Sequence, residues 1–305
     1  MKIVLVAGAT GLVGGHLIEA LETHGFGIRI LSRSGNSSGT PVPSRVYPWT
    51  ALAEALDGVD AVINLAGENI GAQRWTPERQ RVLRESRLAS TQRIVQAIRL
   101  LPERPELLLN ASAVGIYESR GEALVDEDGA VGAGFLADLC RDWEVAAQGV
   151  IPLGLRLVSL RMGVVLAREG GALPRMSLPI RRFVGCRLGS GRQGFSWIHI
   201  HDLVALILAT LSNRAYEGPV NATAPFPISQ GEFIQELARQ LHRPLWPLPA
   251  RLTSLALKVG LGQMAQEMLL QGALVRPQKA LSLGFTFRYP DAAMALADLI
   301  RPVHP

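Results

Sequence analysis

The sequence has very little cysteine and lysine. Among its 305 residues there are 2 cysteines, Cys140 and Cys186, which are far apart and lack metal-ligand spacing. This argues against a disulfide framework and against a zinc site, and it predicts buried free thiols. Lysine occurs at positions 2, 258 and 279 only, so nearly all of the 31 basic residues are arginines.

Long hydrophobic runs are absent as well. The apolar start, Ile3 to Val6, is too short for a signal-peptide core, and no other run approaches the length of a membrane span. We therefore expect a cytoplasmic protein with no membrane partner. The formal net charge is +5, but the arginines are scattered. Scattered arginines favour an anionic small ligand and argue against a nucleic-acid partner.

What the sequence does contain is most informative at its start, from Met1 to Leu21. The run Ile3 to Val6 predicts a strand buried on both faces of a parallel sheet. Gly8, Gly11 and Gly14 follow at spacings of three residues, and an amphipathic helix begins directly after them. Such glycines permit a tight turn, close approach of a pyrophosphate and packing of helix against strand. The stretch predicts a dinucleotide-binding loop at a helix N-terminus.

The next predicted strand, Gly27 to Arg33, ends where these folds bind the adenosine ribose. A carboxylate there would bind the 2′-hydroxyl of NAD, whereas an arginine accommodates the 2′-phosphate of NADP. The strand ends in Ser32 and Arg33, and no Asp or Glu occurs between Glu22 and Glu54. We predict NADP over NAD, the alternative being an ordinary solvated arginine. Residues 34–44 are predicted to form a surface loop.

The middle of the chain predicts further strands and a long helix. Asp60 to Gly67 is a strand that ends in small residues, which would let a cofactor lie across its carboxyl end. Thr76 to Leu100 is a helix with Thr76 as N-cap, on which Arg87 and Thr91 lie one turn apart. Leu107 to Ser112 is another strand, with Tyr117 just beyond it.

Leu153 to Val165 predicts one more strand, and the glycines from Gly170 to Gly194 predict an irregular stretch. Five arginines stand in or beside it, which favours an anionic substrate, although a solvated basic face explains them equally well: Arg175, Arg181, Arg182, Arg187 and Arg192.

Three later features predict local structure. The run His199, His201, Asp202 lacks a third-ligand pattern, so we expect no metal site, and Asp202 is predicted to cap a helix from Leu203 to Leu211. Gly218 to Ala222 reads as the last strand of the sheet. Beyond the proline-rich segment 244–249, four short amphipathic helices are predicted to pack back on the first domain: Leu252 to Val259, Met264 to Leu270, Pro277 to Leu283 and Asp291 to Ile300.

These motifs together resemble a known family. GATGLVG, LSR, NLAG, the serine at position 112 and WIHIHD are similar to extended short-chain dehydrogenases/reductases of the nucleotide-sugar epimerase type. NLAGENI, SRLAST, FLADLCRDWE and the tail RPQKALSLGFTFRYPD more closely resemble an atypical epimerase-like family with a C-terminal domain of unknown function. The cofactor-binding residues predicted from motifs and resemblance are Gly8, Thr10, Gly11, Leu12, Val13, Gly14, Ser32, Arg33, Leu65, Ala66, Gly67, Arg87 and Val165.

The sequence departs from the resemblance at the catalytic pair. Working enzymes of the superfamily carry a tyrosine and, four residues later, a lysine on one helix face. None of the four tyrosines has a lysine at that spacing, and no lysine lies between Lys2 and Lys258. Aligned on Glu144, the helix starting at Gly134 has Leu136 and Cys140 at the two positions. The nearest catalytic candidates are Ser112, as a hydrogen-bond donor, and Tyr117, as an acid or base, the alternative for Tyr117 being an aromatic ring that packs over the cofactor cleft. Cys140 is a more distant candidate, for which buried packing is favoured.

We therefore expect an α/β, Rossmann-type doubly wound parallel sheet over residues 1–225 and a small, mostly helical substrate-side domain over residues 245–303. The predicted function is an NADP-binding, epimerase-like oxidoreductase without the usual catalytic pair. The alternative is a non-catalytic NADP(H) sensor that acts through a protein partner. The sequence leaves the substrate and the oligomeric state open.

Overall fold

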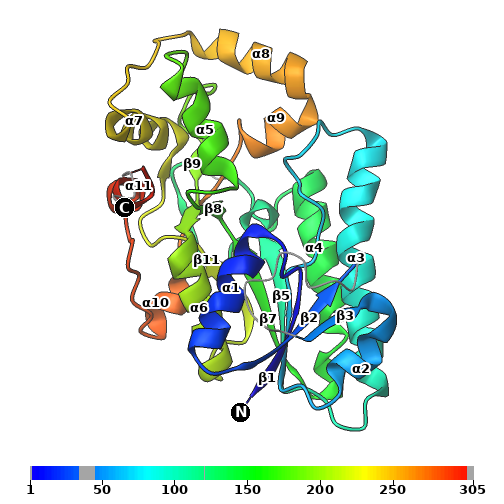
Figure 1. Ribbon diagram of the computed structural model, residues 1–305. Helices are drawn as coiled ribbons and strands as arrows, with labels where there is room; N and C mark the ends of the chain where they lie inside the picture. Colours follow the sequence, from blue (N-terminus) through cyan, green and yellow to red (C-terminus); the bar gives the residue numbers. More distant parts are fainter. Residues whose placement is uncertain (1, 34–44, 120, 301–305) are drawn as a thin grey trace.

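A seven-stranded parallel sheet forms the centre of the computed structural model, which describes residues 2–33, 45–119 and 121–300. The strand order is β11-β7-β5-β4-β1-β2-β3 (Figure 1). This doubly wound order confirms the predicted Rossmann-type fold. The strands are β1 (Ile3–Ala7), β2 (Gly27–Ser32), β3 (Arg45–Pro48), β4 (Ala61–Asn64), β5 (Leu107–Ala113), β7 (Arg156–Met162) and β11 (Gly218–Ala222). The surface loop predicted at 34–44 lies outside the described residues.

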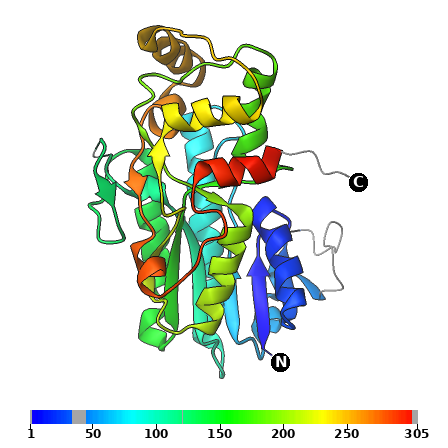
Figure 2. The same cartoon turned by 90° about the vertical axis from the view of Figure 1, so that its left-hand side faces the viewer.

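Helices cover both faces of this sheet. On one face lie α1 (Leu12–Thr23) and α6 (Ile200–Ser212), and on the other α2 (Leu52–Leu56), α3 (Pro77–Leu100) and α4 (Phe135–Gln148) (Figures 1 and 2). In β1, Val4 and Val6 pack with α1 and α6, while Leu5 and Ala7 pack toward α2 and α3. Both alternating sets are buried, which explains why the first strand is a continuous apolar run.

The start of α3 follows the predicted helix signals. Thr76 is the N-cap, and its side-chain oxygen accepts a hydrogen bond from the N–H of Arg79, 3.1 Å away. Pro77 occupies the first helical position, where its missing N–H costs nothing. The predicted bounds of this helix are confirmed.

Two predictions for the segment after residue 150 are wrong. The expected strand Leu153 to Val165 is divided at Gly163 into β7 and β8 (Val164–Leu166), and β8 pairs with β10 (Trp197–His199) instead of extending the sheet. A Cβ at Gly163 would lie 2.8 Å from the carbonyl oxygen of Ser196, which explains the glycine. The expected irregular stretch contains the helix α5 (Ala172–Arg181), because its glycines flank the helix without interrupting it.

The C-terminal elements share a core with the first part of the chain. They comprise α8 (Ala250–Leu261), α9 (Gln263–Met268), β13 (Leu274–Val275), α10 (Gln278–Ser282) and α11 (Ala292–Ile300). Strand β13 pairs with β6 (Leu124–Val125), and α11 packs with α7 (Gln230–Gln240) in one apolar cluster. A small antiparallel pair, β9 (Gly194–Phe195) with β12 (Ile228–Ser229), contacts both β13 and α7. The end of the predicted second domain, 301–303, lies outside the described residues.

Figure 2 shows the C-terminal elements gathered along one edge and one end of the sheet, with α8 farthest from the N-terminus. Among the described residues, no helix is long and apolar enough to span a bilayer.

Candidate functional site

The glycine loop after β1 lies against the end of β4. A Cβ on Gly8, whose φ is +86°, would lie 2.7 Å from the carbonyl carbon of Leu65, and one on Gly14 would lie 2.4 Å from the carbonyl oxygen of Gly8. Leu65 in turn donates its N–H to the carbonyl oxygen of Ala7 at 2.9 Å. The structure thus brings Gly8, Gly14, Leu65 and Ala66 together at one point of the sheet edge.

Helix α1 begins in this loop with no side-chain cap. Gly11 is its N-cap residue, the first turn contains no acidic residue, and Thr10 and Gly11 are exposed. First-turn N–H groups without such a cap leave a positive end that favours a phosphate. Leu12 and Val165, both in the predicted set, meet nearby: a Cβ on Gly171 would lie 3.0 Å from the Leu12 side chain and 3.3 Å from the Val165 carbonyl oxygen.

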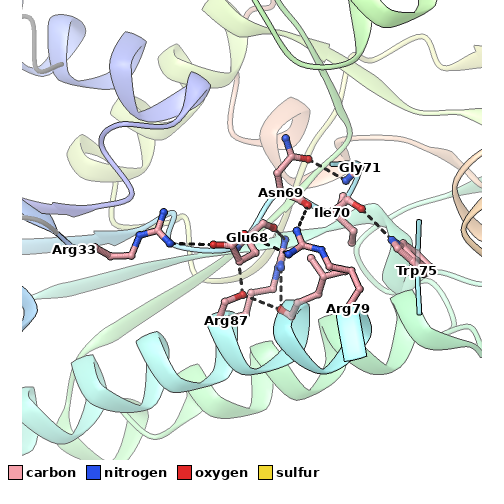
Figure 3. A network of polar contacts seen from close by, with 10 residues as sticks. Arg33, Glu68, Asn69, Ile70, Gly71, Trp75, Arg79 and Arg87 are labelled. Atoms are coloured by element: carbon pink, nitrogen blue, oxygen red, sulfur yellow. Dashed lines mark hydrogen bonds and ion pairs between the residues drawn. The ribbon is translucent and has the colours of Figure 1, made fainter. Parts of the chain in front are cut away.

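Arg33, at the end of β2, forms an ion pair with Glu68, which lies just beyond β4. The Arg33 Nη1 to Glu68 Oε1 distance is 3.0 Å, and the side chains are 88% and 32% exposed, respectively. An ion pair this exposed is worth little and exchanges readily with other partners. Figure 3 shows Arg33 reaching Glu68 from one side while two arginines of α3 approach from the other.

The two arginines of α3 are Arg79 and Arg87. Arg79 Nη1 lies 3.5 Å from Glu68 Oε2, and its Nη2 donates to the Asn69 carbonyl oxygen at 2.7 Å (Figure 3). Arg87 is buried, donates to the carbonyl oxygens of Glu68 and Leu83 at 3.0 Å each, and burial lowers its pKa. We call Arg33, Glu68, Arg79 and Arg87 the Glu68 cluster. It has three cationic groups and one carboxylate, an excess of positive charge at this edge.

The predicted proximity of Arg87 and Thr91 is confirmed, because both contact Trp143 of α4. The Arg87 guanidinium lies 5.1 Å from the centre of the Trp143 ring, and Trp143 Nε1 donates to Thr91 Oγ1 at 2.9 Å. Thr91 also accepts from Asn64 Nδ2 at 2.9 Å. Buried polar groups therefore fix the end of β4 against α3 and α4.

Ser112, at the end of β5, lies in a different environment. It is 1% exposed, and its Oγ donates to Glu144 Oε1 at 2.7 Å. The same carboxylate accepts from Arg161 Nε at 2.8 Å and from Arg161 Nη2 at 2.9 Å, a bidentate pair in which both side chains are buried. The hydroxyl of Ser112 is thus already engaged by an internal ion pair.

Tyr117 belongs to the same arrangement. Its hydroxyl donates to Asn221 Oδ1 at 2.6 Å and accepts from Arg161 Nη1 at 2.8 Å. Burial raises the pKa of Tyr117 to about 12, against the opposing influence of Arg161. We call Ser112, Tyr117, Glu144, Arg161 and Asn221 the Glu144 network. It brings both catalytic candidates together through Arg161 and Glu144, and their catalytic roles stay predictions.

Leu136 and Cys140 occupy the two positions at which the similar enzymes have a tyrosine and a lysine, and both side chains pack against neighbouring residues. Leu136 lies over Gly115, where a Cβ would be 3.3 Å from it, and Cys140 is buried. Burial raises the pKa of the Cys140 thiol to about 12. At the start of α4, the Glu267 carboxylate of α9 accepts from the N–H groups of Phe135 and Leu136 at 3.2 Å and 2.8 Å.

His199 and Asp202 have structural partners, and the predicted cap is wrong. His199 is the N-cap of α6: its Nδ1 accepts from the N–H of His201 at 3.1 Å. Asp202 lies within the first turn and accepts from the N–H groups of Arg288 and Tyr289 at 2.8 Å and 2.9 Å. Asp202 thus anchors the C-terminal segment, a role that needs a contact 86 residues away in sequence.

The arginines after residue 170 divide between several places. Arg175 donates to the carbonyl oxygen of Gly71 at 2.7 Å, next to the Glu68 cluster. Arg187 and Arg192 line a cavity of about 470 Å³ that Glu122 and Glu232 also line. Arg181 and Arg182 are exposed at the end of α5. The cavity therefore has charges of both signs.

Sequence reasoning missed several of the residues that hold these sites together. Asn64 is the last residue of β4 and Glu68 lies just beyond it, so their place at the carboxyl edge was a usable signal, while Asn110 lies within β5 and bonds to Asn64. The roles of Glu144, Arg161 and Asn221 depend on contacts between three elements distant in sequence, and no local pattern marks them.

Comparisons with known proteins identify the family. Residues 4–222 match the model of the NAD dependent epimerase/dehydratase family, and residues 252–299 match a domain of unknown function, DUF1731. Among curated proteins, the chloroplastic epimerase family protein SDR39U1 homolog of Arabidopsis thaliana is 39% identical over 98% of this chain and 86% of its own length. An epimerase family protein of Staphylococcus aureus is 39% identical over 99% of this chain and 100% of its own.

Solved structures give the same result. The human epimerase family protein SDR39U1, crystallised with NADPH, superimposes with a TM-score of 0.87 at 34% identity, covering 98% of this chain and 99% of the human one. A nucleoside-diphosphate sugar epimerase from Corynebacterium glutamicum superimposes with a TM-score of 0.79 at 30% identity, over 98% of this chain and 58% of its own.

Proposed function

Because the chain belongs to the NAD dependent epimerase/dehydratase family, we propose that it binds NADPH and acts as an epimerase-like oxidoreductase on a small anionic molecule. The human relative whose structure contains NADPH supports the choice of cofactor. The cytoplasm is the proposed compartment, although the Arabidopsis relative is described as chloroplastic.

The residues at the sheet edge fit a dinucleotide. The glycine loop leaves no room for a Cβ at Gly8 or Gly14, and helix α1 starts without a side-chain cap, which suits a pyrophosphate. Leu65 and Ala66 would border the adenosine side, and Val165 the nicotinamide side. The bound cofactor would supply a hydride donor or acceptor, and the protein would orient it against the substrate.

One observation carries the preference for NADPH over NADH. Arg33 ends β2 with an 88% exposed side chain, and its partner Glu68 belongs to a cluster with excess positive charge. A 2′-phosphate at this point would bring two negative charges to a guanidinium that binds phosphate in a bidentate manner.

Calorimetric titration of the Arg33→Ala variant with NADPH and with NADH tests this proposal. Loss of a charge-assisted hydrogen bond is worth about 1.5–3 kcal/mol, so we expect NADPH affinity to fall by about 10-fold to 100-fold. NADH affinity should stay within twofold, because NADH has no phosphate at this position. The proposal fails if the unmodified protein binds NADH as tightly as NADPH.

A second function is favoured by the Glu144 network. Both catalytic candidates are hydrogen-bonded inside the protein, and burial raises the pKa of Tyr117 to about 12, which favours its protonated form near neutral pH. This arrangement suits an NADP(H) sensor that acts through a protein partner. NADPH oxidation, followed at the nicotinamide absorbance band with a panel of sugar nucleotides and aldehydes, separates the two. Tight NADPH binding without turnover of any of them would favour the sensor.

A further inference from the structure

Large apolar side chains are exposed together at one end of the molecule. Of the fifteen large apolar residues exposed in the described parts of the chain, eight belong to this group, each at least 45% exposed: Leu178, Phe183, Val184, Trp246, Leu248, Leu252, Leu255 and Val259. We call this group the apolar apex. It lies on the end of α5, the segment that leads to α8, and α8 itself, opposite the N-terminus in both Figure 1 and Figure 2.

The end of α5 and the segment before α8 form one surface. Trp246 Nε1 donates to the carbonyl oxygen of Phe183 at 2.5 Å, and the Trp246 N–H donates to the carbonyl oxygen of Gly185 at 2.9 Å. The guanidinium of Arg243 lies 4.7 Å from the centre of the Phe183 ring. Hydrogen bonds therefore hold an exposed phenylalanine and an exposed tryptophan side by side, with a cation next to them.

Helix α8 continues this surface with an exposed apolar face. Leu252, Leu255 and Val259 are spaced by three and four residues, so they project from one side of the helix. Within α8 the one buried residue is Thr253, whose hydroxyl accepts from the N–H of Gly189 at 3.1 Å. The helix is thus attached to the protein through another side and presents leucine and valine to solvent.

The charge around the apolar apex is positive. No acidic residue occurs between Glu169 and Asp202 or between Glu236 and Glu267. Glu236 is paired with Arg239, and Glu267 is bonded to the start of α4. Within residues 178–184 and 243–259, which carry the apolar apex, the exposed basic residues are Arg181, Arg182, Arg243, Arg251 and Lys258.

We propose that the apolar apex docks onto an anionic membrane surface, with α8 lying in the plane of the interface. Interfacial helices combine an apolar face with flanking Lys and Arg, and tryptophan is enriched at the level of the lipid headgroups. Basic residues near such a surface are attracted by its negative potential. A second copy of this chain fits less well, because it would bring two positive surfaces together.

This proposal replaces the expectation of no membrane partner. That expectation rested on the absence of a spanning segment, and an interfacial helix needs none. The tertiary structure supplies the decisive fact. The prediction that the helix Leu252 to Val259 packs its apolar face on the first domain is wrong, because the apolar residues of that face are exposed in α8.

Co-sedimentation of the full chain with lipid vesicles tests the proposal. We expect the protein to bind vesicles of phosphatidylglycerol and phosphatidylcholine, to bind pure phosphatidylcholine much more weakly, and to be released by high salt. The variant Arg251→Gln with Lys258→Gln should bind about 25-fold more weakly, at about fivefold for each cation near the surface. The triple variant Leu252→Ser, Leu255→Ser, Val259→Ser should lose binding.

A matched control is Leu100→Ser with Ile151→Ser, which removes two exposed apolar side chains outside the apolar apex. This variant should bind as the unmodified protein does, and all variants should keep their melting temperature because the changed side chains are exposed. Quenching of tryptophan fluorescence by lipids brominated near the headgroup gives a second readout. The extent of quenching should be smaller in Trp246→Phe, because this variant lacks the tryptophan of the apolar apex.

Four results would overturn the proposal. One is no binding of the unmodified protein to the anionic vesicles, and another is equal loss of binding in the control variant. A third is a stable dimer in solution that the triple variant converts to monomer, which would assign the face to a second copy. The fourth is binding to soluble polyglutamate without binding to vesicles, which would assign it to an acidic protein.

Discussion

The carboxyl edge of the sheet has two regions, the glycine loop and the surroundings of Ser112 and Tyr117, whose polar groups have different partners. At the glycine loop, helix α1 starts without a side-chain cap, and the exposed Arg33 forms an ion pair with Glu68. Around Ser112 and Tyr117, the hydroxyl groups, a guanidinium and a carboxylate are bonded to one another inside the protein. The first half has donors available to a ligand, whereas the second uses its donors to hold the fold together.

The difference favours ligand binding at the glycine loop over chemistry at Ser112 and Tyr117. A 2′-phosphate can take the place of the partly exposed Glu68 carboxylate beside Arg33 at small cost, because an ion pair near the surface contributes little. A substrate that needed Ser112 would have to compete with a buried, bidentate ion pair, and removing a partner from such a pair is costly.

The largest effect that tests this comparison is expected from Glu144→Ala. The change leaves Arg161 buried with its charge uncompensated, so the free energy of unfolding should fall by about 3–5 kcal/mol. Urea unfolding measures it. The control is Glu78→Ala, which removes an exposed ion pair with Arg81 and should leave the free energy of unfolding nearly unchanged. Equal effects of the two changes would show that the Glu144 network is not structural.

The next effect concerns the glycine loop. A Cβ at Gly14 would lie 2.4 Å from the carbonyl oxygen of Gly8, so Gly14→Ala should displace the loop and cost about 3 kcal/mol of cofactor binding, a factor of about 100. NADPH titration measures it. Gly15→Ala is the matched control, because a Cβ there meets no atom within 4 Å. If Gly14→Ala kept full affinity, the loop would not be the cofactor site.

A third prediction extends the comparison to a buried histidine. Burial and His201 lower the pKa of His199 to about 4, below the ordinary value of 6.5, while Asp298 opposes the shift. Between pH 4 and pH 6.5, His199 is protonated in the unfolded chain but not in the folded protein. Its contribution to the free energy of unfolding is therefore fully present above pH 6.5 and is lost as the pH falls toward 4.

Urea unfolding at pH 7 and pH 5 measures this dependence. We expect a loss of about 2 kcal/mol from this group between the two pH values, because one pKa unit corresponds to about 1.4 kcal/mol. The variant His199→Gln should show a correspondingly smaller loss, while His24→Gln, which changes an exposed histidine, should behave as the unmodified protein does. An identical pH profile in His199→Gln would contradict the structural role.

The smallest expected effect concerns Glu68. Its carboxylate lies 3.0 Å from Arg33 and would repel a 2′-phosphate, so Glu68→Gln should tighten NADPH binding by up to about fivefold, the value of an exposed ion pair. NADH binding should not change. Glu85→Gln, which alters another exposed partner of an arginine, is the control. Weaker NADPH binding in Glu68→Gln would mean that Glu68 positions Arg33 for the phosphate.

Much of the fold could be predicted because its signals are local. The glycine loop, the N-cap at Thr76 and the strand Gly218 to Ala222 each depend on residues adjacent in the chain. The prediction of an irregular stretch after Gly170 failed because the sequence does not distinguish glycines that flank a helix, as those around α5 do, from glycines within a loop. The prediction that Asp202 caps a helix failed because its partners, the N–H groups of Arg288 and Tyr289, lie 86 and 87 residues away in the sequence.

Four features could be predicted from the sequence: the family resemblance, the sheet, the glycine loop at the start of a helix and the absence of a tyrosine and lysine pair. These follow from spacing along the chain and from which residue types are present. Three facts became visible in the folded protein: Ser112 and Tyr117 share one ion-paired network, Glu68 faces three arginines, and α8 exposes its apolar side. Those facts depend on which distant elements pack together, and packing distributes burial and charge in ways that local spacing does not record.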